Sequence, residues 1–435
     1  MQMALKMGSP AFSCLMDNMT IHTTHLKGIP MKITRVTPIL GQGNICASWV
    51  FAKVETDDGL VGYGEGTRHA GPVIAEAIRW LEPHVVGKNP FDVEALYTTM
   101  FKATHYTWGA VFSCAITAIE TALWDIMGKA VGKPVYELLG GKVWDRVRLY
   151  SHIGGGSQII GMGVDDGAIA SDDFGAIKER AQDLVARGFT CVKTFQAGRY
   201  DITDGNSAGL ADFWPNMHMD RRDIQATARK VEFIREQVGD DVEITFDAHG
   251  LNAVSALRLA KALEPFDLLW YEEPVHPFNL SALKQLRAET SIPIAMSERL
   301  HASTEFAEVI DTDAVDVLMV DVQWCGGVSQ AKKIAAIAES RYLPVTLHNC
   351  NSPLASVINA HIAMTLPNFL NMEFMDPDVP WRDEIISEPL QVLDGHLIVN
   401  DKPGWGVDIN EDALARYPYD REVSAYEERD QRLRR

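Results

Sequence analysis

The stretch Ile244-Thr245-Phe246-Asp247-Ala248-His249-Gly250 is a short apolar run that ends abruptly in a carboxylate, an imidazole and a glycine. Such a run predicts a buried strand with ionisable side chains at its carboxyl end. In a parallel barrel, the carboxyl ends of the strands carry the active site. Four later stretches have the same form, so the five together predict a single site: Leu268-Leu269-Trp270-Tyr271-Glu272-Glu273-Pro274, Ile294-Ala295-Met296-Ser297-Glu298, Val317-Leu318-Met319-Val320-Asp321 and Pro344-Val345-Thr346-Leu347-His348.

The region around these stretches alternates strand, loop and helix, which is typical of a parallel (β/α) barrel in an α/β protein. The predicted strands are 147–152, 191–195, 242–249, 268–272, 292–298, 315–322, 344–348 and 369–374. The predicted helices are 175–187, 221–238, 253–263, 279–289, 303–310, 328–340 and 352–364. The structural alternative is a doubly wound open sheet, which would place its chemistry mainly at one switch point.

The segments on either side of the barrel predict further units. Residues 31–145 form an α+β lobe, with antiparallel strands to about residue 66 and near-3.6 spacing from about residue 72 that ends at Gly140-Gly141. The barrel then occupies 146–375. Residues 1–30 lack periodicity and are expected to lie outside the fold, and 376–435 is expected to return to the first lobe and to end in a solvated charge run.

Composition excludes several classes of partner. The chain has 435 residues, 46% of them hydrophobic, and a formal charge of −19, which argues against nucleic acid and anionic membranes. Its six cysteines show no close pairing, so neither a disulfide framework nor a thiolate zinc site is indicated. No apolar run of about 18 residues and no export signal are apparent. We therefore expect a cytoplasmic protein with two packed units.

Three carboxylates end three adjacent predicted strands, 25 and 26 residues apart: Asp247, Glu272 and Glu298. Any one of them alone is more simply a helix cap or a solvated loop residue. Three acids cannot share a dry site without neutralisation, and an all-oxygen set favours Mg²⁺ over zinc. Glu273 is the alternative ligand at the second strand, but its position before proline is expected to turn it elsewhere.

A histidine and an aspartate end the seventh and sixth strands, where His348 and Asp321 should lie within hydrogen-bond reach. A carboxylate behind an imidazole orients it and raises its basicity, as a general base requires. His249 lies two residues after Asp247, so it is predicted to share a strand face with that acid and to point into the site. Its strand is opposite that of His348, so His249 would face the base as an acid. Weaker signals are Lys193, as a countercharge or substrate contact, and Glu373, as a substrate contact.

Two long loops, 153–174 and 196–222, should lie above the same barrel mouth, where loops often act as lids. The second loop contains four residues for which solvated surface is a nearly equal interpretation: Arg199, Tyr200, Trp214 and His218.

A set of motifs over about 31–410 is distinctive when taken together: Ala122-Leu123-Trp124-Asp125-Ile126, Gly128-Lys129, Leu138-Leu139-Gly140-Gly141, Glu272-Glu273-Pro274, Ser297-Glu298-Arg299, the Asp321/His348 spacing and Pro403-Gly404-Trp405-Gly406. On these motifs the chain resembles the enolase superfamily, specifically the mandelate racemase subgroup and its acid-sugar dehydratases. The resemblance implies a modified (β/α)7β barrel of the TIM type under an α+β capping domain. It also implies one Mg²⁺ and removal of the proton α to a carboxylate to give an enediolate, chemistry for which this superfamily uses a lysine or histidine base.

Transferred by position, the family's metal ligands match the three strand-end acids, its base dyad matches His348 with Asp321, and its eighth-strand glutamate matches Glu373. The Asp-x-His at 247–249 is similar to the galactonate-dehydratase type, in which the histidine protonates the departing 3-hydroxyl. Racemases of the subgroup usually carry Lys-x-Lys on strand two. This chain has Lys193-Thr194-Phe195, which lacks the second base.

The expected function is therefore dehydration of a small-molecule acid sugar, an aldonate, to a 2-keto-3-deoxy acid. The first alternative is a mannonate-dehydratase-like enzyme with a base drawn from Arg199 and Tyr200. The second alternative is a racemase or cycloisomerase, and the third is a catalytically silent protein on the same scaffold. Relatives often form symmetric assemblies, so a homo-oligomer is expected.

Overall fold

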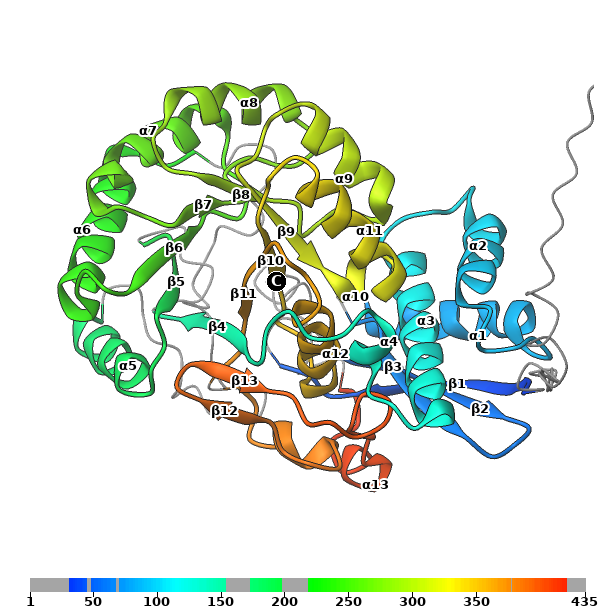
Figure 1. Cartoon of the computed structure of the whole chain (residues 1–435). Coiled ribbons are helices and arrows are strands. Elements are labelled where there is room, and N and C mark those ends of the chain that lie inside the picture. Colours follow the sequence, from blue (N-terminus) through cyan, green and yellow to red (C-terminus); the bar gives the residue numbers. More distant parts are fainter. Residues whose placement is uncertain are drawn as a thin grey trace, which may run out of the picture.

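The computed structural model describes residues 31–44, 48–67, 70–153, 173–197, 218–376 and 378–420. The predicted N-terminal extension, the terminal charge run, most of both predicted lid loops, and Arg199, Tyr200 and Trp214 lie outside these residues. Figure 1 shows a ring of helices around a barrel, with the first lobe packed against one side of it.

The barrel consists of eight parallel strands, each hydrogen-bonded to its sequence neighbours, and it closes where β11 pairs with β4. These strands are β4 (Val147–His152), β5 (Cys191–Phe195), β6 (Glu243–Asp247), β7 (Trp270–Glu272), β8 (Ile294–Met296), β9 (Val317–Asp321), β10 (Val345–His348) and β11 (Phe369–Glu373). Closure confirms the predicted barrel and excludes the open doubly wound sheet.

Helices follow the strands and cover the barrel (Figure 1). They are α5 (Phe174–Ala186), α6 (Arg221–Val238), α7 (Ala253–Leu263) with a 3₁₀ turn (Glu264–Phe266), α8 (Leu280–Glu289), α9 (Ala302–Asp311), α10 (Val322–Cys325), α11 (Val328–Glu339) and α12 (Pro353–Ala363). All seven predicted barrel helices are present. The short α10 was not predicted, because four residues carry no readable period.

Several predicted strands were too long at their carboxyl ends. The strand predicted as 242–249 ends at Asp247, and the one predicted as 292–298 ends at Met296. The backbone then leaves the extended region, with φ of 50° at His249 and 115° at Ser297. Apolar alternation continues into these turns, so sequence pattern alone could not locate the ends.

The first lobe packs an antiparallel sheet against helices. Its elements are β1 (Ile33–Gly41), β2 (Trp49–Thr56), β3 (Val61–Glu65), α1 (Gly71–Val85), α2 (Val93–Thr104), α3 (Ala110–Val131) and α4 (Val135–Leu138). Gly62 and Gly64 in β3 let the sheet approach the backbone of α3 too closely for any side chain. By length and composition α3 could cross a membrane, contrary to our reading of the sequence, but 78% of its most apolar window is buried within the structure.

The chain after the barrel divides between the two units. The hairpin β12 (Gln391–Leu393) and β13 (His396–Ile398) pairs antiparallel with β4, so this part of the tail extends the barrel sheet. The following segment does reach that lobe: Trp405 N–H donates to Asp125 Oδ1 at 2.9 Å. The remaining elements are a 3₁₀ turn (Arg382–Ile385) and α13 (Glu411–Leu414).

Buried carboxylates of the first lobe hold the starts of two barrel helices. Glu65 accepts backbone N–H groups of Ser352 (3.1 Å) and Ala355 (2.9 Å) at the start of α12. Glu120 accepts those of Val328 (2.9 Å) and Ser329 (3.0 Å) at the start of α11. A carboxylate is favourable there, because the N-terminus of a helix presents unpaired N–H groups and a partial positive charge.

Candidate active site

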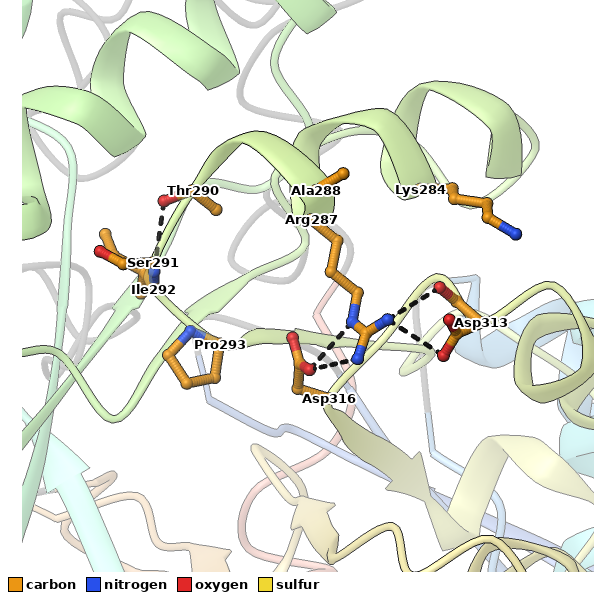
Figure 2. A pocket seen from close by; sticks show the side chains of 9 residues that line it. All are labelled: Lys284, Arg287, Ala288, Thr290, Ser291, Ile292, Pro293, Asp313 and Asp316. Atoms are coloured by element: carbon orange, nitrogen blue, oxygen red, sulfur yellow. Dashed lines mark hydrogen bonds and ion pairs between the residues drawn. The ribbon is translucent and has the colours of Figure 1, made fainter.

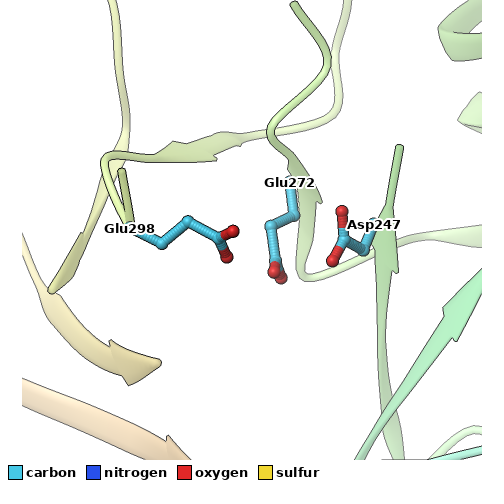
Figure 3. Close-up of side chains that lie close together, drawn as sticks. All are labelled: Asp247, Glu272 and Glu298. Atoms are coloured by element: carbon cyan, nitrogen blue, oxygen red, sulfur yellow. The ribbon is translucent and has the colours of Figure 1, made fainter. Parts of the chain in front are cut away.

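Three carboxylates converge at the carboxyl end of the barrel. Asp247 and Glu272 end β6 and β7 and stand side by side in the strand register. Glu298 follows β8 by two residues. One oxygen of each lies within 4.8 Å of the others, all three side chains are buried, and Figure 3 shows them facing one another. The predicted cluster is therefore present.

The turns after the strands decide which acids face inward. Ser297, with its positive φ, redirects the chain so that Glu298 reaches the cluster. Glu273 also has a positive φ, of 42°, and it points away: its Oε1 accepts Ser297 N–H at 2.9 Å and its Oε2 lies 3.7 Å from Arg299 Nε. The choice of Glu272 over Glu273 at this position therefore agrees with the geometry.

Lys193, on β5, is the positively charged side chain beside the three carboxylates. Its Nζ lies 3.0 Å from Asp247 Oδ2 and 3.0 Å from Glu373 Oε1, and it also pairs with Glu272. Burial alone would lower the pKa of Lys193, but the surrounding carboxylates raise it well above its usual value. The ammonium therefore stays charged and supplies part of the countercharge, as the sequence suggested.

The cluster still carries more negative charge than one lysine can balance. Burial, and then the nearby Asp247 carboxylate, raise the pKa of Glu272 well above its usual value. A hard divalent cation would remove this cost, since it prefers a set of carboxylate oxygens. The donor set of Asp247, Glu272 and Glu298 fits Mg²⁺ on these grounds, and it contains no nitrogen or sulfur ligand that would favour zinc.

His348, at the end of β10, pairs with Asp321, at the end of β9. The Nδ1 of His348 lies 2.8 Å from Asp321 Oδ2, and Asp321 Oδ1 accepts the N–H of Gln323 at 2.9 Å. Because a carboxylate only accepts, Nδ1 carries the proton and Nε2 faces the cluster, 3.3 Å from Glu298 Oε2. Burial would lower the pKa of His348, but neighbouring Glu298 and the other acids raise it well above its usual value.

His249 lies beside Asp247, but not for the reason predicted. The strand does not extend to it, so alternation along β6 cannot orient the ring. Its left-handed backbone brings Nδ1 to 3.0 Å from Asp247 Oδ1, and the side chain keeps 29% exposure. β6 and β10 are four strands apart in an eight-strand ring, so His249 and His348 do approach from opposite sides.

Glu373, at the end of β11, joins both halves of the site. Its Oε1 contacts Lys193, and its Oε2 accepts the N–H of Asn349 at 3.1 Å and lies 3.4 Å from His348 Nε2. Sequence reasoning missed one further member: the Nε2 of His152, at the end of β4, lies 2.7 Å from Glu373 Oε1. The signal was available, because His152 is an ionisable residue at the end of the first predicted strand.

Two other groups of polar residues are not among the converging acids. The ring nitrogen Nδ1 of His218 lies 3.4 Å from Ser255 Oγ, at the start of α7. A hollow of about 310 Å³ is lined in part by Arg287, Asp313 and Asp316. Figure 2 shows Arg287 paired with both aspartates. The hollow borders the amino ends of β8 and β9, the opposite end of the barrel from the carboxylates, so its charged groups serve to join loops there.

Chemically, the site combines an anionic pocket for a divalent cation with imidazoles on two sides. A carboxylate-oriented imidazole can remove a proton, and a second imidazole across the site can deliver one. Such a pair serves reactions in which a proton and a leaving group depart from neighbouring carbons.

Comparisons with known proteins agree with this architecture. Residues 22–140 match the mandelate racemase / muconate lactonizing enzyme N-terminal domain, and residues 176–413 match the enolase C-terminal domain-like family. The chain is 30% identical to a D-xylonate dehydratase of Haloferax volcanii over 91% of each chain. It is 34% identical to a D-galactonate dehydratase of Xanthomonas oryzae pv. oryzae, over 89% of this chain and 94% of that protein.

Solved structures show the same likeness. A mandelate racemase/muconate lactonizing enzyme-like protein from Rubrobacter xylanophilus superimposes with a TM-score of 0.79 at 34% identity, covering 91% of this chain and 99% of the other.

Proposed function

Because the chain belongs to the mandelate racemase and muconate lactonizing enzyme family of the enolase superfamily, we propose that it is a Mg²⁺-dependent hydro-lyase. Its substrate is an acid sugar, an aldonate, and its product is a 2-keto-3-deoxy acid. The observation that carries the proposal is the pair of imidazoles, His348 and His249, on opposite sides of one acidic cluster.

His348 is the proposed base. Its Nε2 takes the proton from C2, and the electrons of the C–H bond pass into the carboxylate to form an enediolate. Asp321 holds Nδ1–H and stabilises the imidazolium that results. Asp247, Glu272 and Glu298 would hold a divalent cation, which when bound would stabilise the negative charge that develops on the substrate carboxylate.

His249 is the proposed acid. When the enediolate collapses, the bond between C3 and its hydroxyl breaks, and His249 gives that oxygen a proton so that it leaves as water. The resulting enol converts to the 2-keto acid. The partial exposure of His249, 29% of its side chain, lets the ring recover a proton from solvent after each turnover.

Two features favour this reaction over the other candidates. The 2.8 Å contact between His348 and Asp321 supports a base on β9 and β10, whereas the mannonate-type alternative draws its base from the loop after β5. Phe195 ends β5 where a racemase carries its second lysine, so two-base racemisation lacks a group on that strand.

The relatives bearing the names D-xylonate and D-galactonate dehydratase support an aldonate as substrate. We expect the enzyme to act as a homo-oligomer in the cytoplasm, without nucleic acid or membrane partners. A library of aldonates and aldarates, screened for 2-keto acid formation, identifies the substrate.

The two histidines are separated by following C2 exchange with solvent deuterium by proton NMR. We expect His348→Asn to abolish both exchange and dehydration, because it removes the base. We expect His249→Asn to abolish dehydration but to retain slow exchange, because the base and the metal ligands remain. His396→Asn, at the opposite end of the barrel, is the control. Exchange that survives only in the His348 variant would reverse the two roles.

A further inference from the structure

His152 ends β4 at the same barrel mouth as the proposed catalytic groups, yet the reaction above gives it no role. It is buried, with 5% exposure, and its Nε2 lies 2.7 Å from Glu373 Oε1. In the strand register it stands beside Lys193 of β5. A polar side chain buried at this depth normally has a defined partner, and here the partner is the eighth-strand glutamate.

Glu373 is surrounded by nitrogen atoms, and three of them donate hydrogen bonds to it. Its Oε1 lies 2.7 Å from His152 Nε2 and 3.0 Å from Lys193 Nζ. Its Oε2 accepts the N–H of Asn349 at 3.1 Å and lies 3.4 Å from His348 Nε2. Burial would raise the pKa of Glu373, but Lys193 and then His348 lower it well below its usual value. Glu373 is therefore an anion whose carboxylate plane is set by these partners.

The surroundings of His152 favour its neutral form. Burial lowers its pKa, and Lys193 lowers it further, while Glu373 and the more distant Asp247 act in the opposite direction without reversing the shift. Arg180, from α5, donates to the backbone carbonyl of His152 at 3.2 Å. A neutral imidazole that faces an anion must present its one N–H, so Nε2 carries the proton.

We propose that His152 is a positioning residue: its Nε2–H holds Oε1 of Glu373 against Lys193, and this turns Oε2 toward the reacting nitrogen of His348. The inference rests on the proposed function, which assigns proton removal to His348. Once His348 has taken the proton, the imidazolium lies beside a fixed anion that needs no reorganisation. Without His152, Oε1 of Glu373 keeps only its contact with Lys193, so the carboxylate can turn and Oε2 loses this alignment.

A neighbouring ring supports a fixed imidazole. The ring of Phe195 meets that of His152 edge to face, with centroids 5.3 Å apart and planes at 86°. Phe195 therefore packs against the imidazole and limits its rotation. Phe195 therefore has a second role in this proposal, in addition to occupying the position where racemases carry a lysine. It keeps the Nε2 of His152 directed at Glu373.

The decisive variants are His152→Gln and His152→Asn. Glutamine can place an amide N–H near the position of the imidazole Nε2, whereas asparagine is too short to reach Glu373. We expect kcat to fall about 100-fold in the asparagine variant and to stay within roughly fivefold of wild type in the glutamine variant. KM and the Kd for Mg²⁺ should change less than about threefold in both. His396→Gln is the matched control.

Three outcomes of this comparison overturn the proposal. The first is an equal loss of kcat in the two variants, which would mean that the imidazole itself transfers protons. The others are a near-normal kcat in the asparagine variant and a loss confined to Mg²⁺ binding. Thermal melting of each purified variant shows whether it is folded. If His152→Asn does not fold, His152→Ser supplies the same loss of reach in a smaller side chain.

A second measurement does not depend on turnover. Nitrogen NMR of the full chain with ¹⁵N-labelled histidine, in Mg²⁺, should show one imidazole that stays neutral with its proton on Nε2 from about pH 6 to pH 8. The signal belongs to His152 if it disappears in His152→Gln. A charged ring, or a proton on Nδ1, contradicts the inference. If no acid sugar is dehydrated, the proposed function fails while this experiment still decides the geometry.

Discussion

At the residue scale, the orientation of His348, the proposed base, depends on Asp321. Asp321 receives Nδ1–H at 2.8 Å and is itself held by the N–H of Gln323. This arrangement fixes the tautomer, so that Nε2 is the nitrogen presented to the acidic cluster. Replacing Asp321 by asparagine keeps the shape of the side chain but removes its charge. This substitution therefore separates the effect of orientation on His348 from the effect of charge.

We expect Asp321→Asn to keep the fold and to lower kcat by roughly 100-fold or more, because the amide no longer stabilises the imidazolium. Circular dichroism tests the fold and the pH–rate profile tests the base. Asp313→Asn, on the far end of the barrel, is the matched control. A profile identical to that of wild type would show that this pair is not the base.

The metal proposal is also tested at a single residue. Glu298→Gln removes one charged ligand from the cluster while keeping its size, so we expect Mg²⁺ to bind at least about tenfold more weakly. Isothermal titration calorimetry measures this Kd directly, without a substrate. Glu308→Gln, on the exposed face of α9, should bind as the wild type does. Equal affinity in the two variants would remove Glu298 from the metal site.

At the scale of elements, acidic side chains from the first lobe hold the starts of α11 and α12, and so fix the lobe against the barrel. Glu65 illustrates the energetics. Burial raises its pKa to about 7, although hydrogen bonds from Ser352, Thr67 and Ala355 act to lower it. The folded protein therefore retains a proton on Glu65 at pH values where the unfolded chain has released it.

This shift predicts a pH dependence of stability. Between the ordinary glutamate value, near 4.5, and about 7, the folded state binds more protons than the unfolded state, so stability falls as pH rises. Glu65→Gln removes that contribution. The free energy of unfolding of the Glu65→Gln variant minus that of the wild type should therefore increase as the pH rises through this interval, by up to about 3 kcal/mol. Urea denaturation at about pH 5 and pH 8 measures the difference, and a constant difference would contradict it.

At the scale of the whole molecule, the carboxyl end of the barrel concentrates acidic groups. Three buried carboxylates lie within 4.8 Å of one another in a chain whose formal charge is already −19. Ligands that bind only the folded state stabilise it by mass action. A cation in this cluster should therefore stabilise the molecule globally, in addition to any role in the reaction.

We expect EDTA to abolish activity and to lower the melting temperature by a few degrees, and Mg²⁺ to restore both. At a Mg²⁺ concentration about 100 times its Kd, the gain in stability should be near 2.7 kcal/mol. Differential scanning calorimetry measures the shift, with K⁺ at equal ionic strength as the control. Full activity in metal-free buffer, or equal stabilisation by K⁺, would contradict the proposed cofactor.

Much of the architecture could be predicted because it depends on local pattern. Apolar runs such as 317–321 identify buried strands, and 3.6-residue spacing identifies the helices between them. Once the strands are known to form a parallel barrel, their carboxyl ends must share one rim. The convergence of Asp247, Glu272 and Glu298, and the pairing of His348 with Asp321, follow from that rule.

The sequence by itself therefore determined the number and order of the barrel strands and the acids at or just beyond their carboxyl ends, because periodicity and spacing are properties of neighbouring residues. Only the tertiary structure decided how the side chains beyond those ends are oriented. The left-handed backbone at His249 and Glu273 sends one toward the cluster and the other away. The contact between His152 and Glu373 joins the first and last barrel strands, 221 residues apart, and the side-chain orientations that form it are set only once β11 has closed against β4.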